Sequence, residues 1–138
     1  MRSAYGVQIG GQAAAGVVSE KPELFGKLLV LQALPGTQGI YGFLTAVLIM
    51  VRTGLLGGGA VELTMQQGWS FFFAALPMAI VGLLSAMSQG KAAVAAIHMT
   101  AKQPEASAKG ITMTALVETY AILALLVSVL LIFVGIQI

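Results

Sequence analysis

The sequence predicts an all-α integral membrane protein whose fold is a duplicated transmembrane helical hairpin. Three observations support this fold class. The 138 residues are 58% hydrophobic and only 9% charged, whereas soluble domains carry about 25% charged residues. Uncharged windows long enough to cross a bilayer recur along the chain. The chain also matches itself when it is shifted by 82 residues, so that residue 22 falls on residue 104.

Charge and composition exclude several functions. Seven basic and five acidic residues give a net charge of +2, which is too little for a surface that neutralises nucleic acid phosphates. With no cysteine and a single histidine, the chain lacks the residues for thiol catalysis, disulfides or a multi-histidine metal site. We expect no signal peptide, because the N-terminus has no charged region followed by an apolar core. The expected partner is therefore the lipid bilayer, and no nucleic acid.

The first hairpin repeat is expected over residues 1–52. Its first helix, about 3–19, coincides with a marginal apolar window, and its second, about 25–51, is long enough to project beyond the hydrocarbon. A polar turn in which Pro22 precedes Glu23 separates the two helices. An external connection rich in glycine, residues 53–65, then leads to the second repeat.

The second hairpin repeat is expected over residues 66–138, with helix 3 at about 66–100 and helix 4 at about 110–138. The polar turn between them again contains a proline followed by a glutamate, and the shift of 82 residues also brings Lys27 onto Lys109. Helix 3 begins near Gln66, whose equivalent in the first copy would precede Met1. We therefore expect the first helix to lack its outer half.

Positive charge indicates how the hairpins are oriented. Only Arg52 lies near the external connection, whereas five lysines gather towards the other helix ends, namely Lys21, Lys27, Lys91, Lys102 and Lys109. The positive-inside rule then places the two Pro-Glu turns in the cytoplasm and both termini outside.

Small residues at a spacing of four form matching ladders in helices 1 and 3. The ladder of helix 1 is Gly6, Gly10 and Ala14. Its equivalent in helix 3 is Ser88, Ala92 and Ala96, beside an adjacent stripe of Gly82, Ala86 and Gly90. Membrane helices gain nothing from the hydrophobic effect against one another, so small side chains that permit close backbone approach favour their association. We expect helices 1 and 3 to pack closely in an inner layer.

Glu118 is the only acidic residue well inside an apolar window. A charge at the middle of a bilayer costs about 2.5–3.5 kcal/mol on insertion scales, so such a residue normally faces a partner, a cavity or an ion pathway. The alternative is a permanently protonated structural carboxyl that hydrogen-bonds to a neighbour. We take Glu118 as the main candidate for the functional residue.

Oxygen donors from other helices accompany this carboxylate. The Thr37 hydroxyl and the amide carbonyls of Gln38 and Gln89 are each more typical of helix packing, but together they form a donor set that suits a hard cation. Pro35 removes a backbone donor and is expected to free the Leu31 carbonyl, which loosens the second helix one turn before these residues. With Na⁺ or H⁺ bound, such a site is neutral overall.

Four segments resemble the proteolipid (K or c) subunit of bacterial V-type ATPases, sodium-pumping members included. They are 34–43 (LPGTQGIYGF), 89–91 (QGK), 102–105 (KQPE) and 117–123 (VETYAIL). The resemblance covers nearly the whole chain and implies that identical copies form a ring in the bacterial plasma membrane. It implies that this ring rotates against a membrane stator subunit and binds a central-stalk subunit at the cytoplasmic turns. The chain would then be no enzyme by itself, but the ion-translocating subunit of an ATP-driven rotary complex.

The resemblance also implies roles for individual residues. Glu118 is the ion-carrying carboxylate, and Tyr41 hydrogen-bonds to it. The ion ligands are the Leu34 backbone carbonyl and the side chains of Thr37, Gln38, Gln89 and Glu118. The Leu34 carbonyl rests on resemblance alone, because Pro35 directly frees Leu31. At the shift of 82 residues Gly36 occupies the place of Glu118, so each four-helix chain keeps one carboxylate. His98 is expected to be a surface histidine.

Two other classes of protein remain alternatives. A stand-alone small cation/proton transporter would use the same carboxylate, but it has no need of long cytoplasmic helix extensions. A structural ring or pore would keep the small-residue ladders, but it has no use for the oxygen donors. A proton site needs only a carboxyl and one acceptor, so the three further donors would be costly to bury without a cation. The expected transported ion is therefore Na⁺, with H⁺ as the alternative.

Overall fold

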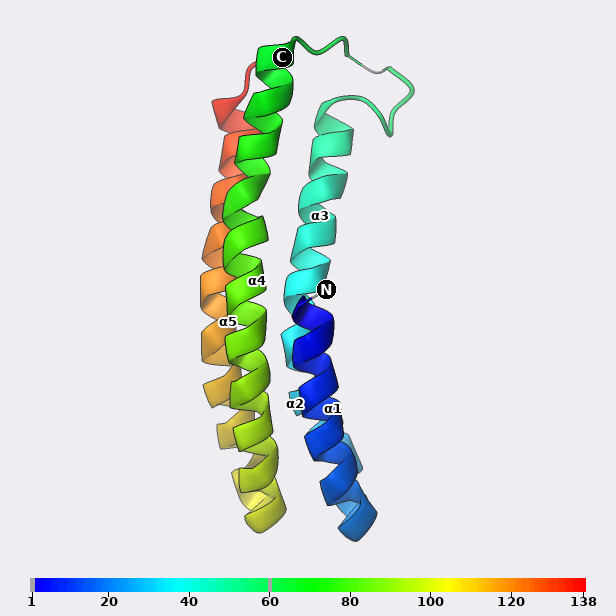
Figure 1. Ribbon diagram of the computed structural model, residues 1–138, viewed down its shortest axis with the longest axis vertical. Coiled ribbons are helices and arrows are strands. Elements are labelled where there is room, and N and C mark those ends of the chain that lie inside the picture. The colour runs from blue at the N-terminus through cyan, green and yellow to red at the C-terminus, as the bar shows by residue number, and fades with distance from the viewer. Residues whose placement is uncertain (1, 60) are drawn as a thin grey trace.

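The structure, a computed structural model, describes residues 2–59 and 61–138. Its α-helices are α1 (Arg2–Glu20), α2 (Phe25–Ala33), α3 (Thr37–Arg52), α4 (Met65–Lys102) and α5 (Ser107–Leu130), and no strand occurs in the described ranges. In Figure 1, α1 and the α2–α3 rod form one hairpin beside a second hairpin of α4 and α5. The all-α prediction is confirmed.

Three helical segments are long and apolar enough to cross a membrane: Pro22–Arg52, Met65–Lys102 and Pro104–Gly135. The first of these joins α2 to α3 through a 3₁₀ turn at Leu34–Gly36, and the last continues α5 into a π-helical turn at Leu131–Gly135. α1 is shorter, with 19 residues, and starts level with the middle of α4 in Figure 1. The Arg2 guanidinium accordingly lies 2.8 Å from the Met87 sulfur.

The two Pro-Glu turns fold in the same way. Each proline opens a 3₁₀ turn, at Pro22–Leu24 and at Pro104–Ala106, because its fixed φ suits the first turn of a helix and its missing N–H would have no partner there. The residue before each turn has nearly the same backbone angles, −134° and 75° at Lys21 and −135° and 87° at Gln103. The repeat inferred from the sequence is thus also present in the local backbone.

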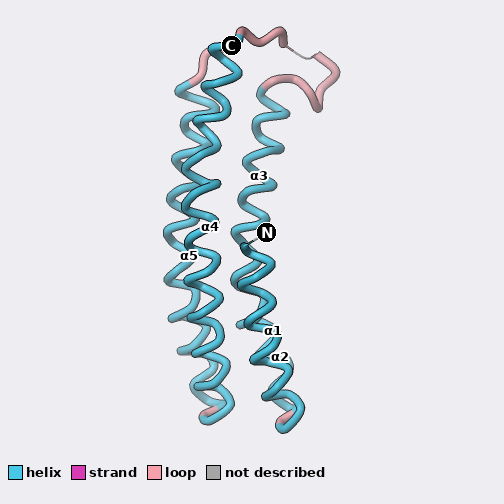
Figure 2. Tube along the Cα trace, in the orientation of Figure 1, coloured by secondary structure: helices cyan, strands magenta, loops and turns pink. Residues whose placement is uncertain are grey.

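The connection between the hairpins is the longest non-helical part in Figure 2. Gly54 and Gly58 adopt positive φ angles of 73° and 75°, a conformation that glycine reaches without steric cost. α4 then begins in a capping box, in which the Thr64 side chain accepts the Gln67 N–H and the Gln67 side chain accepts the Thr64 N–H.

Pro35 interrupts the α-helix directly before Thr37 and Gln38. The chain tightens into the 3₁₀ turn Leu34–Gly36, and the Thr37 N–H bonds to the Leu34 carbonyl. Because a 3₁₀ turn is tighter than an α-helix, the Leu34 carbonyl accepts an N–H from three residues later instead of four. The proline ring itself is buried, and a Cβ added to Gly6 would lie 2.7 Å from Pro35 Cβ.

The hairpins meet most closely where α1 crosses α4. Gly6, Gly10 and Ala14 are buried, and a Cβ added to Gly90 would lie 2.7 Å from Gly6 Cα. The close packing of the first and third helices is confirmed. On α4, however, the stripe of Gly82, Ala86 and Gly90 is buried, whereas Ser88 is exposed and Ala92 only partly buried. The glycines allow a closer approach of the two backbones than Ser88 would.

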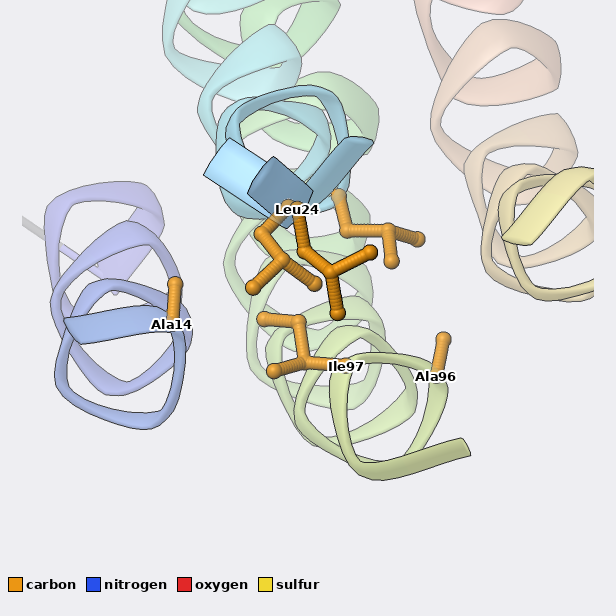
Figure 3. Close-up of a cluster of buried hydrophobic side chains, with 6 residues drawn as sticks. Ala14, Leu24, Ala96 and Ile97 are labelled. Atoms are coloured by element: carbon orange, nitrogen blue, oxygen red, sulfur yellow. The ribbon is translucent and has the colours of Figure 1, made fainter. Parts of the chain in front are cut away.

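A cluster of buried aliphatic side chains and two lysines align the hairpins at the end that carries the turns. The cluster, shown in Figure 3, contains Ala14, Leu24, Leu28, Leu31, Ala96 and Ile97. Beside it, Lys21 Nζ donates to the Ala101 carbonyl at 2.6 Å and Lys27 Nζ donates to the Pro104 carbonyl at 3.0 Å. Ala101 lies in the last turn of α4, where cations interact favourably with free carbonyls, and Pro104 opens the 3₁₀ turn that follows.

We predict that Gly90→Leu separates α1 from α4, because the new side chain would meet the Gly6 backbone. Overpacking typically costs about 1–3 kcal/mol, so the thermal midpoint in detergent, followed by circular dichroism, should fall by roughly 5 °C or more. Gly42→Leu is the matched control, since nothing lies within 4 Å of a Cβ there. Equal midpoints for the two variants would contradict this packing.

Candidate ion-binding site

Glu118 lies on α5 and is held by a residue of the other hairpin. The Tyr41 hydroxyl, one turn into α3, donates a hydrogen bond to Glu118 Oε1. The carboxyl group is partly buried between the hairpins. Tyr41 therefore fixes the direction of the carboxylate from across the interface, and Oε1 keeps the capacity to accept further partners.

Gln38 and Gln89 form the buried centre of the site. Gln38 Nε2 donates to Gln89 Oε1, and Gln89 Nε2 donates to the Thr114 carbonyl at 3.3 Å. The two side chains are only 4% and 0% exposed. Gln38 Oε1 is buried and has no hydrogen-bond partner within the described residues. Leaving a buried acceptor unsatisfied costs about 1–3 kcal/mol, and a cation would satisfy this oxygen.

The turn at Pro35 brings two further oxygens together. Thr37 Oγ1 donates to the Leu34 carbonyl at 2.9 Å. A hydroxyl that donates its proton in this way keeps its lone pairs free for a cation. The Leu34 carbonyl already accepts both the hydroxyl and the backbone N–H of Thr37. Its place beside Thr37 follows from the 3₁₀ turn and not from a carbonyl freed by the proline.

The structure brings the candidate residues together in pairs. Tyr41 is joined to Glu118, Gln38 to Gln89, and Thr37 to Leu34. In the described part of the chain no hydrogen bond links the carboxylate to the glutamines. The candidate ligands thus lie on α3, α4, α5 and the turn before α3, and Gln38 Oε1 is left without a hydrogen-bond partner among the described residues.

The donor chemistry favours a monovalent hard cation. One carboxylate accompanies neutral amide, hydroxyl and backbone oxygens, so a bound Na⁺ would leave the site neutral. A divalent ion would leave an uncompensated charge at membrane depth. The described residues contain no group of three or more histidine, cysteine or acidic side chains that could hold a metal ion.

Two polar contacts to α5 were missed from the sequence, and the first of them positions a candidate site residue. The Thr114 carbonyl accepts from Gln89 and so orients its amide. Thr114 lies about one helical turn from Glu118 on α5, and this spacing was the sequence signal that it lies near the site. Farther along the same helix, Ser128 Oγ accepts the Met78 N–H at 3.2 Å. The sequence signal for this contact was Pro77, because a proline inside a helix disturbs the backbone hydrogen bonds around it. His98 is exposed, as expected.

Comparison with known proteins identifies a family and two relatives. The sequence profile of the ATP synthase C-subunit family matches residues 1–49 and 72–131. The two matched segments end at 49 and 131, which are 82 residues apart, the offset of the internal repeat. The V-type sodium ATPase subunit K of Enterococcus hirae is 48% identical over 94% of this chain and 80% of its own length. The A-type ATP synthase subunit K of Methanocaldococcus jannaschii is 41% identical over 94% of this chain and 54% of its own length.

We predict that Tyr41→Phe weakens Na⁺ binding without unfolding the site, because the carboxylate loses the donor that orients it. Hydrogen bonds to charged groups contribute about 1.5–3 kcal/mol, so affinity should fall about tenfold or more. Carbodiimides modify protonated carboxyls, and the Na⁺ concentration that half-protects Glu118 measures the affinity. Tyr120→Phe serves as the control, since Tyr120 is 66% exposed. An unchanged half-protecting concentration for Tyr41→Phe would refute the role of its hydroxyl.

Proposed function

Because the chain belongs to the ATP synthase C-subunit family, we propose that it is the proteolipid subunit of a rotary V-type ATPase and carries Na⁺ across the membrane on Glu118. Identical copies form the rotor ring in a bacterial plasma membrane. The ring turns against a membrane stator subunit and is joined to a central-stalk subunit at the Pro-Glu turns. ATP hydrolysis or synthesis takes place elsewhere in the complex, so the chain moves ions and is no catalyst by itself.

The observation that carries the sodium proposal is the buried, unpartnered Gln38 Oε1. A proton on Glu118 would use only one neighbouring oxygen as its acceptor, whereas a cation also uses the Thr37, Gln89 and Leu34 oxygens in addition to that of Gln38. A cation between the glutamines and the carboxylate satisfies the Gln38 oxygen, and the cost of burial is removed. The relative from Enterococcus hirae, whose name contains sodium ATPase, supports the same ion.

The proposed ion ligands have distinct roles. Glu118 supplies the negative charge, while the Gln38, Gln89 and Thr37 side chains and the Leu34 carbonyl replace water around the ion. Tyr41 holds the carboxylate in place through its hydrogen bond. The loaded site is neutral, and rotation through lipid therefore avoids most of the cost of moving a charge there. Unloading requires contact with an aqueous path at the stator, where water can take over as ligand.

Gly36 explains the stoichiometry. It occupies, in the first hairpin, the place that Glu118 has in the second, so the first hairpin supplies neutral ligands and no carboxylate. Each four-helix chain then carries one ion. A ring of such chains moves half as many ions per turn as a ring with the same number of hairpins in which every hairpin carries a carboxylate.

Replacing Glu118 by glutamine should abolish ion translocation, because the amide keeps the shape of the side chain but cannot alternate its charge. We expect the variant chain to insert into the membrane and assemble normally, while ATP-driven ²²Na⁺ uptake into vesicles falls to background. Glu62→Gln, in the exposed connection before α4, should leave uptake unchanged. Wild-type transport by the Glu118→Gln complex would exclude Glu118 as the ion carrier.

Sodium should protect Glu118 from a carbodiimide, most visibly at mildly alkaline pH, where protons compete less for the carboxylate. The double variant Thr37→Ala, Gln89→Ala should lose most of this protection and stay reactive. Thr112→Ala with Gln103→Ala alters the same residue types at exposed positions, so it should keep the protection. If Na⁺ protects at no pH, the site is proton-coupled.

A further inference from the structure

A cavity lies beside the candidate ion site, where the first turn of α1 meets α3 and α4. Its volume is about 280 Å³, and its lining includes Arg2, Ser3, Gln38, Gly39 and Gly82. The two glycines have no side chains to fill this space. Gln38, whose Oε1 has no hydrogen-bond partner within the described residues, thus shares a cavity with a positively charged residue.

Arg2 lies at the depth of the candidate site. Its Nη1 is 2.8 Å from the Met87 sulfur, and Met87 precedes Gln89 by two residues, which is about 3 Å along α4. Gln89 in turn accepts a hydrogen bond from Gln38. Figure 1 shows the same level, because α1 begins beside the middle of α4. The guanidinium therefore lies next to a helix that is long and apolar enough to span the membrane, at the level of the glutamines.

The contact with Met87 leaves the charge of Arg2 uncompensated. A thioether sulfur is neutral and only a weak hydrogen-bond acceptor, whereas a guanidinium keeps its proton in proteins. Charged side chains at membrane depth normally face a partner, a cavity or an ion pathway. For Arg2 the structure offers the cavity that Gln38 also lines.

The helix that carries Arg2 is fixed against both of its neighbours. A Cβ added to Gly39 would lie 3.0 Å from Ser3 Oγ, so the first turn of α1 packs on α3 at the level of the site. A Cβ added to Gly6 would lie 2.7 Å from the Ala86 carbonyl oxygen, so the next turn packs on α4. The fold therefore sets the distance between this charge and the ion ligands.

The internal repeat does not include this charge. At the shift of 82 residues Ser3 falls on Ser85, but Arg2 falls on Leu84, an apolar side chain that is 55% exposed. A cation at this position thus occurs in the first hairpin alone, on the helix whose first turn borders the site. The packing of the two hairpins does not require it, since the second hairpin folds with a leucine there.

From this arrangement we propose that the positive charge of Arg2 sets the Na⁺ affinity of the site on Glu118, an inference that rests on the proposed function. The charge repels a cation held between Gln38 and the carboxylate, and solvent screens this repulsion only weakly at a partly buried site. The site then holds its ion less tightly than its ligands alone would. Arg2 acts through its charge and is not itself a ligand.

Weaker binding favours release of the ion. When Na⁺ leaves, the carboxylate of Glu118 loses its counter-charge at membrane depth, where an uncompensated charge is costly. The guanidinium of Arg2 remains nearby and offsets part of that cost. The same residue thus disfavours the loaded site and favours the empty one, and both effects shift the binding equilibrium towards release.

Equilibrium binding of ²²Na⁺ to the purified complex tests this role. Arg2→Gln and Arg2→Met both remove the charge, the first with a polar side chain and the second with an apolar one. Each should lower the Kd about threefold or more, because the repulsion is gone. Arg2→Lys keeps the charge and should keep the wild-type Kd. The number of sites should be the same in all three variants.

The other arginine of the chain provides the matched control. Arg52 Nη2 donates to the Ile136 carbonyl at 3.3 Å, at the far end of α3 and roughly 20 Å along the helix from Gln38. This separation exceeds the Debye length of about 8 Å at physiological ionic strength. Arg52→Gln removes the same charge from the chain and should leave the Kd unchanged.

Each outcome decides the proposal. Tighter binding by both neutral variants, with the wild-type Kd for Arg2→Lys and Arg52→Gln, supports it. Unchanged or weaker binding by the neutral variants, equal tightening by Arg2→Lys, or equal tightening by Arg52→Gln would overturn it. A wild-type complex without saturable binding removes the proposed sodium function and this role with it. Saturable binding that the Arg2 variants leave unchanged removes the role of Arg2 alone.

Discussion

The carboxylate of Glu118 has to lie at membrane depth, where an ionised group without a partner costs several kcal/mol, and the arrangement of both hairpins follows from how this cost is met. Tyr41 reaches the carboxylate from the first hairpin. Gln38 joins Gln89 across the same interface and keeps one buried carbonyl oxygen free. In the proposed site, a sodium ion would both neutralise the carboxylate and satisfy the unpartnered Gln38 oxygen. Neither hairpin holds this set of ligands alone.

The close approach of α1 to α4 brings together the candidate ligands that the two hairpins supply. Gly6 and Gly90 let the two backbones nearly touch, which brings the α2–α3 rod onto α4 and places Gln38 within reach of Gln89. Pro35 packs against Gly6 and ends α2 in a 3₁₀ turn, so that Thr37 and Leu34 meet directly before Gln38. At the Pro-Glu turns, hydrogen bonds from Lys21 and Lys27 hold the two hairpins in register. Packing by small residues thus sets the geometry of the ligands.

Helix positions were predictable because uncharged windows and Pro-Glu turns depend on local sequence alone. The rotation of each helix about its own axis was not predictable in the same way. The sequence offers two ladders on α4, and only the structure shows that Gly82, Ala86 and Gly90 bury while Ser88 stays exposed. The residue types of the site were also predictable, since a carboxylate in an apolar window is rare. The pairing of Gln38 with Gln89 and the support from Thr114 depend on contacts between helices, which no local pattern encodes.

Equilibrium binding of ²²Na⁺ to the purified complex tests the central claim most directly, because it counts ions and needs no rotation. One saturable site per copy of this chain is expected, weaker at acidic pH through competition with protons and absent from the Glu118→Gln complex. This result would show that the carboxylate shared between the hairpins holds sodium. The absence of saturable binding, or binding that survives Glu118→Gln, would contradict the account. Two sites per chain would contradict the assignment of a single ion-carrying carboxylate to each chain.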